Sequence, residues 1–255
     1  MKDSEEYNVR AVERALQILS CFNDEHPERG VSEIASAVGL HKATTHRIVT
    51  TLLNYGYLER AADGQKYQLG LALIDLGQKV IRRMDLRREA YPFMEQLVQQ
   101  WDETCDLSLF DNGNVFYIEV LEGNHALRIA AAVGMRLPAH CTASGKLFLA
   151  HQSPQELDAY LDQPLIAYTN KTITSPDALR SHLASVRQQG YGLDDEEYEA
   201  EIRAVAAPIC NQQGQVIAAI SIPGPISRMT VERIPKIAES LKEATRAISQ
   251  RMGCH

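Results

Sequence analysis

The stretch at residues 31–53, VSEIASAVGLHKATTHRIVTTLL, constrains the fold more than any other part of the chain. Apolar residues at helical spacing give its first half one hydrophobic face, with Ser32 as the expected N-cap. Gly39 stands where the chain must turn sharply, a conformation that glycine adopts at low cost. The pattern predicts two short helices joined by a tight turn, a helix-turn-helix. The alternative is an ordinary helical hairpin in a globular core.

The second predicted helix divides into a polar half and an apolar half. Its C-terminal half carries core residues such as Ile48 and Leu52. Its N-terminal half is expected to expose hydrogen-bond donors, which suits insertion into a DNA major groove. These donors are His41, Lys42, Thr44, Thr45, His46 and Arg47.

A β-hairpin is predicted directly after this helix. The segments at 57–60 and 66–69 have strand character, and the Asp63-Gly64 pair between them is a strong hairpin signal. A hairpin in this place is the wing of a winged helix-turn-helix. We therefore expect contacts to DNA from the helix-turn-helix and from the wing, at Ser32, His41, Lys42, Ala43, Thr44, Thr45, His46, Arg47, Arg60 and Lys66.

Charge limits how such a domain can bind. The chain carries a net charge of −7, and a chain this acidic has little general affinity for nucleic acid. However, no acid occurs between Glu33 and Glu59, a window that holds Lys42 and Arg47. A locally positive surface on an acidic body is suited to a dimer or tetramer that adds up several modest contacts.

The chain is long enough for two domains at 255 residues, and no apolar run approaches the roughly 18 residues of a membrane span. Five widely spaced cysteines without a CxxC pair are typical of reduced thiols in a cytosol. We therefore expect a cytoplasmic protein that does not contact a membrane.

Beyond residue 84 the pattern mixes helices and strands. Helices are predicted at 85–101, 142–150, 154–161, 177–189 and 231–252, with Ser153 and Ser175 as caps. Strands are predicted at 107–111, 115–122, 127–133, 205–210 and 216–223. We expect an α+β fold in which a winged helix-turn-helix (8–70) and a linker helix (71–84) precede a domain built on an antiparallel sheet (85–255).

At this point the residues resemble the IclR family of bacterial transcriptional regulators over nearly the full length. The resemblance is carried by AVERALQIL at 11–19, the helix-turn-helix at 31–53 and YQLG at 67–70. It continues through 136–150, 190–209 and 216–229.

The resemblance implies a GAF-like effector domain at the C-terminal end. It also implies a homodimer or homotetramer that binds double-stranded operator DNA and represses or activates a catabolic operon. By this resemblance the effector-binding residues are Ile129, Leu137, Thr142, Ala143, Ser144, Gly145, Asp194, Ala204 and Ser221. Relatives often carry serine where Pro223 stands, so the resemblance does not name the ligand.

The residues themselves give an independent reason to place a ligand near Thr142. If Thr142 caps the helix that follows, backbone N–H groups near Ser144 point at any bound anion, which the helix dipole also favours. Asp194 suggests a hydroxyl or amine on the same ligand, because a buried carboxylate needs a donor. The expected effector is a small anionic metabolite.

Two patterns raise the possibility of catalysis or metal binding. The acidic run at 194–197 is of a kind that usually forms a solvated loop. His140 and Cys141 are neighbours that would point to opposite faces of a strand, so they cannot act as a dyad. We expect no catalytic residue, no metal and no cofactor. The alternative to a regulator is an enzymatic or metabolite-binding domain with an accessory winged helix, which a gel-shift assay would distinguish.

Overall fold

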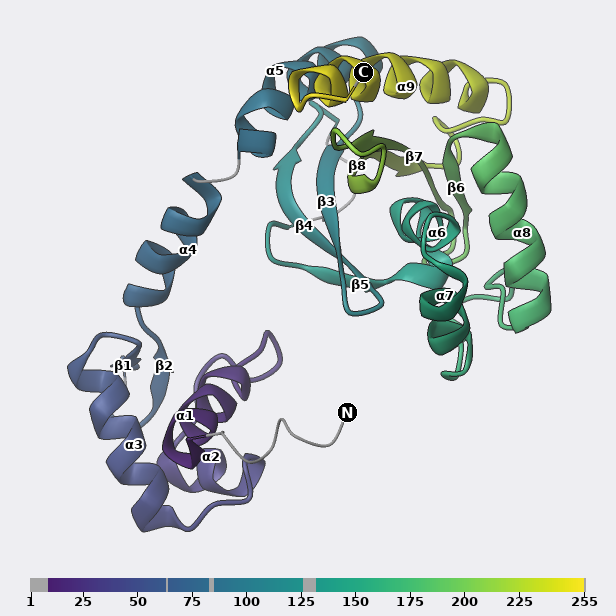
Figure 1. The fold of residues 1–255 in the computed structure, drawn as a ribbon. Helices are drawn as coiled ribbons and strands as arrows, with labels where there is room; N and C mark the ends of the chain where they lie inside the picture. The colour runs from purple at the N-terminus through teal and green to yellow at the C-terminus, as the bar shows by residue number, and fades with distance from the viewer. Residues whose placement is uncertain (1–8, 63, 83–84, 126–131, 255) are drawn as a thin grey trace. The chain divides into compact units, whose positions relative to one another are not determined.

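The computed structural model describes residues 9–62, 64–82, 85–125 and 132–254. Contacts divide the chain into two compact units, Met1–Arg83 and Met84–His255, and each unit is described by itself (Figure 1). None of the helices in these ranges combines the length and the apolar character needed to cross a membrane.

The first unit is a winged helix-turn-helix, as predicted. Its elements are α1 (Arg10–Ser20), α2 (Val31–Ala37), α3 (Lys42–Asn54), β1 (Leu58–Arg60), β2 (Tyr67–Leu69) and α4 (Ala72–Arg82). Gly39 has a φ of 64° between α2 and α3, which confirms the sharp turn. The hairpin is antiparallel, with Arg60 opposite Tyr67.

The expected cap at Ser32 is wrong. Helix α2 begins at Val31, so Gly30 is its N-cap and Ser32 is an exposed residue of its first turn. The backbone N–H of Gly30 donates to Glu33 Oε2 at 2.6 Å. The side chain of Glu33 therefore stabilises the helix start without a hydroxyl at the cap position.

A small core holds the first unit together. It is formed by Ile18, Phe22, Ile34, Val49, Leu52, Leu58 and Tyr67. The apolar residues of α1 do not all contribute to it, because Val12 and Leu16 are 56% and 60% exposed. Helix α1 is therefore apolar on an exposed side as well as on the side that carries Ile18.

The second unit is an α+β domain on a six-stranded antiparallel sheet of order β5-β4-β3-β8-β7-β6. The strands are β3 (Cys105–Asp111), β4 (Asn114–Leu121), β5 (Arg136–Pro138), β6 (Gly192–Asp195), β7 (Ile202–Cys210) and β8 (Val216–Pro225). The helices are α5 (Asp85–Trp101), the 3-10 turn η1 (Ala139–Cys141), α6 (Ala143–Ala150), α7 (Pro154–Leu161), α8 (Pro176–Gln189) and α9 (Ile234–Arg251).

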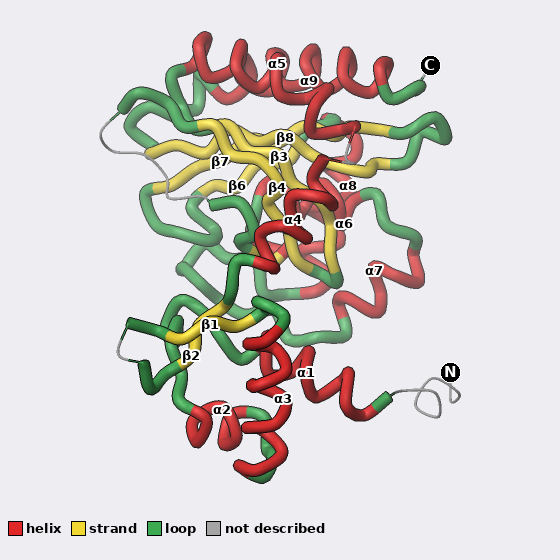
Figure 2. The backbone as a smooth tube through the Cα atoms, turned by 90° about the vertical axis from the view of Figure 1, so that its left-hand side faces the viewer, coloured by secondary structure: helices red, strands yellow, loops and turns green. Residues whose placement is uncertain are grey.

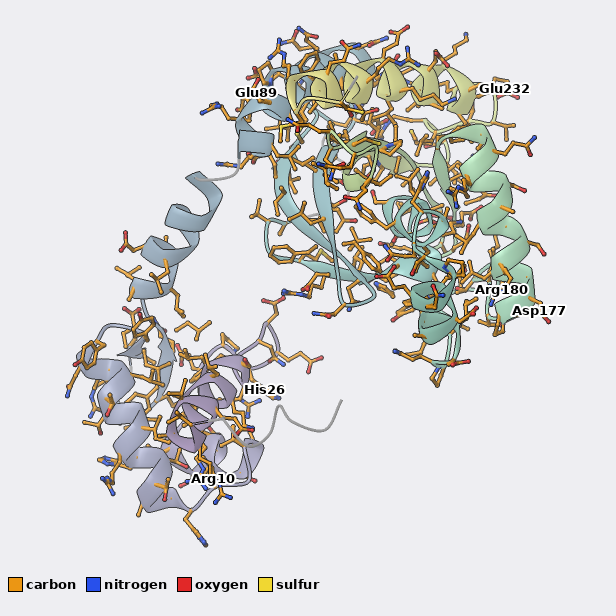
Figure 3. The ribbon with its side chains drawn as sticks, in the orientation of Figure 1. Arg10, His26, Glu89, Asp177, Arg180 and Glu232 are labelled. Carbon is orange, nitrogen blue, oxygen red and sulfur yellow. The ribbon has the colours of Figure 1, made fainter. Side chains whose placement is uncertain are left out.

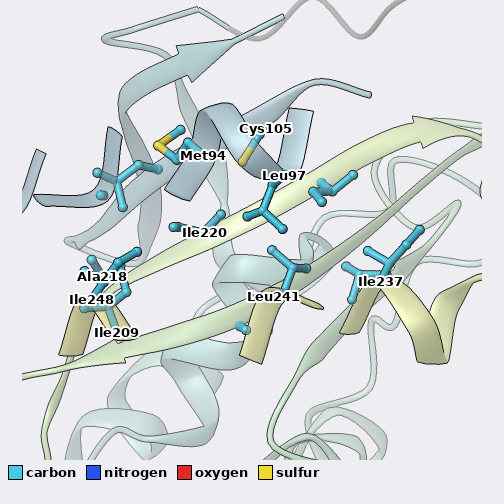
Figure 4. Close-up of a cluster of buried hydrophobic side chains, with 14 of the residues drawn as sticks. Met94, Leu97, Cys105, Ile209, Ala218, Ile220, Ile237, Leu241 and Ile248 are labelled. Carbon is cyan, nitrogen blue, oxygen red and sulfur yellow. The ribbon is translucent and has the colours of Figure 1, made fainter. Parts of the chain in front are cut away.

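The two faces of this sheet support separate hydrophobic cores. Helices α5 and α9 lie on one face, and their residues Met94, Leu97 and Leu241 pack with Ile209 and Ile220 of the sheet (Figures 2 and 4). Helices α6, α7 and α8 lie on the other face in a second cluster of buried side chains. Side chains alternate between the two faces along each strand, so every second strand residue points to the face of the sheet that carries α6, α7 and α8.

Most predicted elements of the second unit are present, with shifted ends. The hairpin between β3 and β4 turns through Asn112 and Gly113, whose φ angles of 48° and 82° both have the sign that such a two-residue turn requires. Ser153 and Ser175 cap α7 and α8 as expected. Most of the strand predicted at 127–133 lies outside the described residues. Strands β5 and β6 are absent from the sequence prediction.

Candidate DNA-binding surface and ligand cavity

The exposed surface of α3 begins at its N-terminal end. His41, Lys42, Ala43, His46 and Arg47 are all exposed, and Thr44 is half-buried. In the 13-residue α3 no acidic side chain opposes this group. The surface can therefore donate hydrogen bonds to base edges or phosphates.

Thr45 does not belong to this surface, and its predicted exposure is wrong. Its side chain is fully buried, and its hydroxyl donates to the His41 carbonyl at 3.2 Å. Thr45 lies four and seven residues before Val49 and Leu52, so it shares their core-facing side of α3. The hydroxyl is satisfied within the helix and is not available to DNA.

The remaining candidates in the first unit lie on α2 and on the hairpin. Ser32 is exposed, and Lys66 is half-buried. The Arg60 guanidinium donates to the Gly64 carbonyl at 2.7 Å and lies 5.2 Å from the centre of the Tyr67 ring. These contacts hold Arg60 close to the hairpin, where its remaining N–H groups can still donate.

Sequence reasoning missed a cationic groove between α1 and α3. The groove has a volume of about 690 Å³ and is lined by Arg10 and Arg14 together with His46 and Arg47. Arg10 lies at the start of α1 in Figure 3. The four-residue spacing of Arg10 and Arg14 places both side chains on one helix face, and this spacing could have indicated the groove.

A cavity of about 390 Å³ lies in the second unit between the sheet and the start of α6. It brings together most of the residues expected to bind an effector, namely Leu137, Thr142, Ala143, Ser144, Asp194, Ala204 and Ser221. Gly145 does not line it, and Ile129 lies outside the described residues. The lining comes from β5, β6, β7, β8 and α6, which are far apart in the sequence.

Two glycines allow α6 to approach the sheet this closely. A Cβ atom at Gly192 of β6 would lie 2.1 Å from the Ala143 carbonyl oxygen, and one at Gly145 would lie 2.3 Å from the Ala139 backbone. Real atoms cannot come so close, so both positions require hydrogen in place of a side chain. Gly145 therefore shapes the cavity through the turn before α6 rather than by lining it.

The start of α6 offers unpaired donors, but its expected cap is wrong. Thr142 occupies the N-cap position, yet its hydroxyl donates to the Pro138 carbonyl at 3.0 Å instead of accepting from the helix. The N–H of Lys146 is the first to reach a helix carbonyl, that of Thr142. The preceding N–H groups, at 143–145, have no acceptor within the helix.

The Ser144 hydroxyl is a second unsatisfied group at this end. Ser144 lines the cavity, is 2% exposed and has no hydrogen-bond partner among the described residues. Leaving a buried hydroxyl unpaired costs free energy, typically about 1–3 kcal/mol. An acceptor placed in the cavity would remove that cost.

Asp194 lies in a strand and not in the solvated loop predicted from the acidic run. It is 5% exposed, and its Oδ1 accepts from the Glu197 N–H at 2.7 Å. Burial raises its pKa to about 7, an effect that the Glu197 N–H and the nearby Lys146 charge only partly offset. The rest of the run is ion-paired, Asp195 with Arg203 and Glu197 with Lys146.

Asp106 of β3 is a cavity residue that sequence reasoning missed. It is 1% exposed, and it accepts from the Ser221 hydroxyl at 2.6 Å. Burial raises its pKa to about 7 as well. The alternation of polar and apolar residues along 105–109 is that of a strand with one face in water. Only the position of α6 shows that this face is covered.

The geometry gives His140 and Cys141 no catalytic arrangement. They lie in a 3-10 turn rather than the predicted strand, and both ring nitrogens of His140 face partners, Tyr160 and the Ile166 carbonyl. Burial and the neighbouring carboxylates raise the pKa of Cys141 to about 12, so it remains a thiol at neutral pH. Within the described ranges, no three His, Cys, Asp or Glu side chains are grouped as metal ligands would be.

Comparison with known proteins agrees with both units. The family described as the IclR helix-turn-helix domain matches residues 11–62, and the one described as the bacterial transcriptional regulator IclR C-terminal matches residues 78–250. The chain is 37% identical over 246 residues to the HTH-type transcriptional regulator XynR of Escherichia coli K12, covering 96% of this chain and 98% of that protein.

Two solved structures show the same fold. The chain matches the Thermotoga maritima IclR with a TM-score of 0.75 and 31% identity, covering 96% of this chain and all of that one (100%). It matches an IclR homologue from Microbacterium hydrocarbonoxydans, solved with 4-hydroxybenzoate, with a TM-score of 0.84 and 33% identity over 95% and 98% of the two chains. The relatives are DNA-binding regulators and not enzymes, and this chain belongs to the IclR family of bacterial transcriptional regulators.

Proposed function

We propose that this regulator binds operator DNA through its first unit and a small organic-acid effector in the cavity of its second. The observation that carries the proposal is the cavity, which is lined by the unsatisfied Ser144 hydroxyl at the start of α6 and by the buried Asp194. One structural relative was solved with 4-hydroxybenzoate, a small organic acid. As a regulator of a catabolic operon, the protein would act in the bacterial cytoplasm, as repressor or activator.

In this proposal the effector's carboxylate binds at the N-terminal end of α6. The N–H groups at 143–145, which have no acceptor within the helix, and the Ser144 hydroxyl supply hydrogen bonds, and the helix dipole favours negative charge. The polar remainder of the effector extends toward Asp194 and Ser221, where its hydroxyl groups can donate to the Asp194 carboxylate. Ala204 is small, which leaves space between these two sides of the cavity.

We further propose that the protein acts as a dimer, or as a dimer of dimers, on a two-fold operator. The first unit exposes apolar side chains that a monomer would leave in water, Val9, Val12 and Leu16 on or next to α1 and Leu71 and Ile74 on or next to α4. Pairing two modestly charged modules raises operator affinity without a new kind of contact. Effector binding must favour one arrangement of the units over another to regulate.

Substitution of Ser144 tests the cavity. Ser144→Leu fills the proposed carboxylate site and should abolish effector binding in titration calorimetry. Binding of labelled operator by the ligand-free protein, measured by fluorescence anisotropy, should remain normal. Ser181→Leu is the control, since Ser181 is an exposed residue of α8. The effector is found beforehand by a thermal-shift screen of organic acids, because a ligand of the native state raises the melting temperature.

Asp194→Ala provides a second test of the same assignment. It should weaken the effector and leave operator binding unchanged, whereas Asp195→Ala, on the same strand and facing the other way, should change neither strongly. Normal effector binding by Ser144→Leu would mean that the effector binds elsewhere.

A further inference from the structure

The start of α6 packs against Gly192 of β6, whereas Asp106 lines the cavity from a different strand. Asp106 is on β3, and the sheet order places β8 and β7 between β3 and β6, which carries Asp194. Three strand spacings correspond to about 14 Å across a flat sheet, and less across a curled one. The two carboxyl groups therefore face different parts of any molecule in the cavity.

The position of Asp106 is fixed by the sheet. Asp106 and Ser221 are directly paired across β3 and β8, and the Ser221 hydroxyl donates to Asp106 Oδ1. That bond orients the carboxyl group and uses one of its acceptor sites. The remaining sites of Asp106 need donors, and the cavity is where an occupant can supply them.

The charge of the lining narrows the chemistry of that occupant. Asp106, Asp194, Glu199 and Glu201 line the cavity, and none of the described lining residues is Lys or Arg. A molecule that carried only negative charge and apolar groups would give no donor to the remaining acceptor sites of these two buried carboxyl groups. Hydroxyl groups satisfy them without bringing in a further charge.

The start of α6 selects the other end of the molecule. Its free N–H groups and the unpaired Ser144 hydroxyl need an acceptor, and a carboxylate is the strongest small organic one. The expected ligand therefore has a carboxylate at α6, one donor group near Asp194 and another near Asp106. A short carbon chain that carries donor groups along its length has this arrangement.

We propose that Asp106, positioned by Ser221, is a ligand-recognising residue, and that the effector is a polyhydroxylated carboxylic acid whose far hydroxyl groups donate to Asp106. This assignment rests on the proposed function, in that it names the class of molecule that occupies the same cavity. In this proposal the protein distinguishes its effector from other organic acids by the end of the ligand that is far from the carboxylate.

Six-carbon probes isolate each feature of the proposal. D-Gluconate, D-galactonate and D-mannonate carry both the carboxylate and the hydroxyl groups. Hexanoate lacks the hydroxyl groups, D-sorbitol lacks the carboxylate, and 6-aminohexanoate replaces the distal hydroxyl with an amine. In calorimetry with the full chain, at least one of the three hydroxy acids should bind at least about tenfold more tightly than each of the other probes.

At about pH 8, where the Asp106 carboxyl group is ionised, Asp106→Asn should weaken binding of that hydroxy acid by about tenfold or more, since hydrogen bonds to a charged group are the stronger kind. It should have no comparable effect on hexanoate. Asp111→Asn is the matched control, the same chemical change on the same strand but outside the cavity, where Asp111 contacts Arg136. Should Asp106→Asn not fold, Ser221→Ala tests the same contact through the loss of the orienting hydroxyl.

Several results would overturn the proposal, and they differ from those that would overturn the cavity assignment. Hydroxy-acid binding that survives Asp106→Asn but is lost in Ser144→Leu removes the role of Asp106 and leaves the proposed function intact. Tighter binding of hexanoate or 6-aminohexanoate, or failure of all three hydroxy acids to bind, removes the ligand class. A ligand that binds Ser144→Leu normally contradicts the proposed function itself.

Discussion

The side chains of Lys146 and Glu197 form a buried ion pair that joins α6 to the segment between β6 and β7. The two side chains are 0% and 7% exposed, so the pair is almost entirely removed from water. The same segment contributes Tyr198 and Glu199 to the cavity lining. The ion pair therefore helps to hold one cavity wall against the helix whose N-terminus forms another.

Removing one member of this pair should destabilise the protein strongly. Lys146→Met leaves the Glu197 carboxylate buried without its cation, and such a loss typically costs about 3–5 kcal/mol. The free energy of unfolding, measured by urea denaturation, should fall by that amount. The double variant Lys146→Met/Glu197→Leu should recover most of the loss, because no uncompensated charge remains.

Lys171 and Glu196 provide the matched control. Glu196 is next to Glu197 in the sequence, but its ion pair with Lys171 is partly solvated, with Lys171 44% exposed. Lys171→Met should cost no more than about 1 kcal/mol. Equal losses from Lys146→Met and Lys171→Met would contradict the view that burial determines the cost.

The two sides of the groove between α1 and α3 are predicted to make different kinds of DNA contact. Arg47→Ala on α3 should weaken operator binding by about 1–3 kcal/mol and relax the preference at one base position. Arg14→Ala on α1, expected to contact phosphate, should weaken all sequences alike and reduce the salt slope by about 1. Fluorescence anisotropy with operator and scrambled duplexes measures both effects.

Arg180 on the surface of α8 serves as the control for these substitutions (Figure 3). Arg180→Ala removes the same charge from the other unit and should leave operator binding unchanged. Normal operator affinity in the double variant Arg47→Ala/Lys42→Ala would exclude α3 as the recognition helix.

Stability should depend on pH through Asp106 and Asp194. Their pKa values are raised to about 7 in the folded protein, against about 3.9 in an unfolded chain. Between these values the folded state holds protons that the unfolded chain releases. The contribution of these two groups to the free energy of unfolding is therefore fully present below the unfolded pKa and is lost as pH rises toward 7, by up to about 1.4 kcal/mol per pH unit for each group.

Asp106→Asn should remove the contribution of one group from this slope. Urea denaturation across pH values from about 5 to about 8 measures it, and Asp111→Asn should retain the wild-type slope. Lys146 and Glu197 are the charged neighbours of Asp194, and they form an ion pair with each other. Neither residue is substituted in these two variants. Identical slopes in the wild type and in Asp106→Asn would mean that Asp106 is ionised in the folded protein.

We predict that the chain self-associates through the exposed apolar face of α1. Leu16→Glu places a charge on that face and should shift the light-scattering mass toward the monomer at micromolar concentration, with a loss of operator affinity. Val231→Glu is the control, since Val231 is 66% exposed and lies in the second unit. Wild-type mass and operator affinity in Leu16→Glu would exclude α1 from the dimer contact.

The winged helix-turn-helix was predictable because its determinants are local. Gly39 marks the turn, and the hairpin signal follows the second helix within a few residues. The burial of Thr45 was also accessible from the sequence, since it has helical spacing to Val49 and Leu52. The position of Thr45 on the core-facing side of the helix, and not its hydroxyl group, determines that it is buried.

The chemistry of the cavity was only partly predictable, because its partners are distant in sequence. Ser221 meets Asp106 across 115 residues, and Glu197 meets Lys146 across 51. The acidic run at 194–197 and the alternating strand at 105–109 both have sequence patterns typical of solvent-exposed segments. Only the position of α6 in the structure shows that they are covered. The family resemblance supplied Asp194 and Ser221, but residue patterns contained no signal that Asp106 is buried.

Gly192 has a consequence for redesigning this protein as a sensor. Because no methyl group fits between β6 and the carbonyl of Ala143, the spacing between these two walls is set by backbone atoms in contact. Side-chain substitutions elsewhere in the cavity lining would then alter which molecule fits without changing the spacing between β6 and α6. A library restricted to positions 106, 204 and 223 could therefore redirect the response to another compound while the reporter promoter stayed the same.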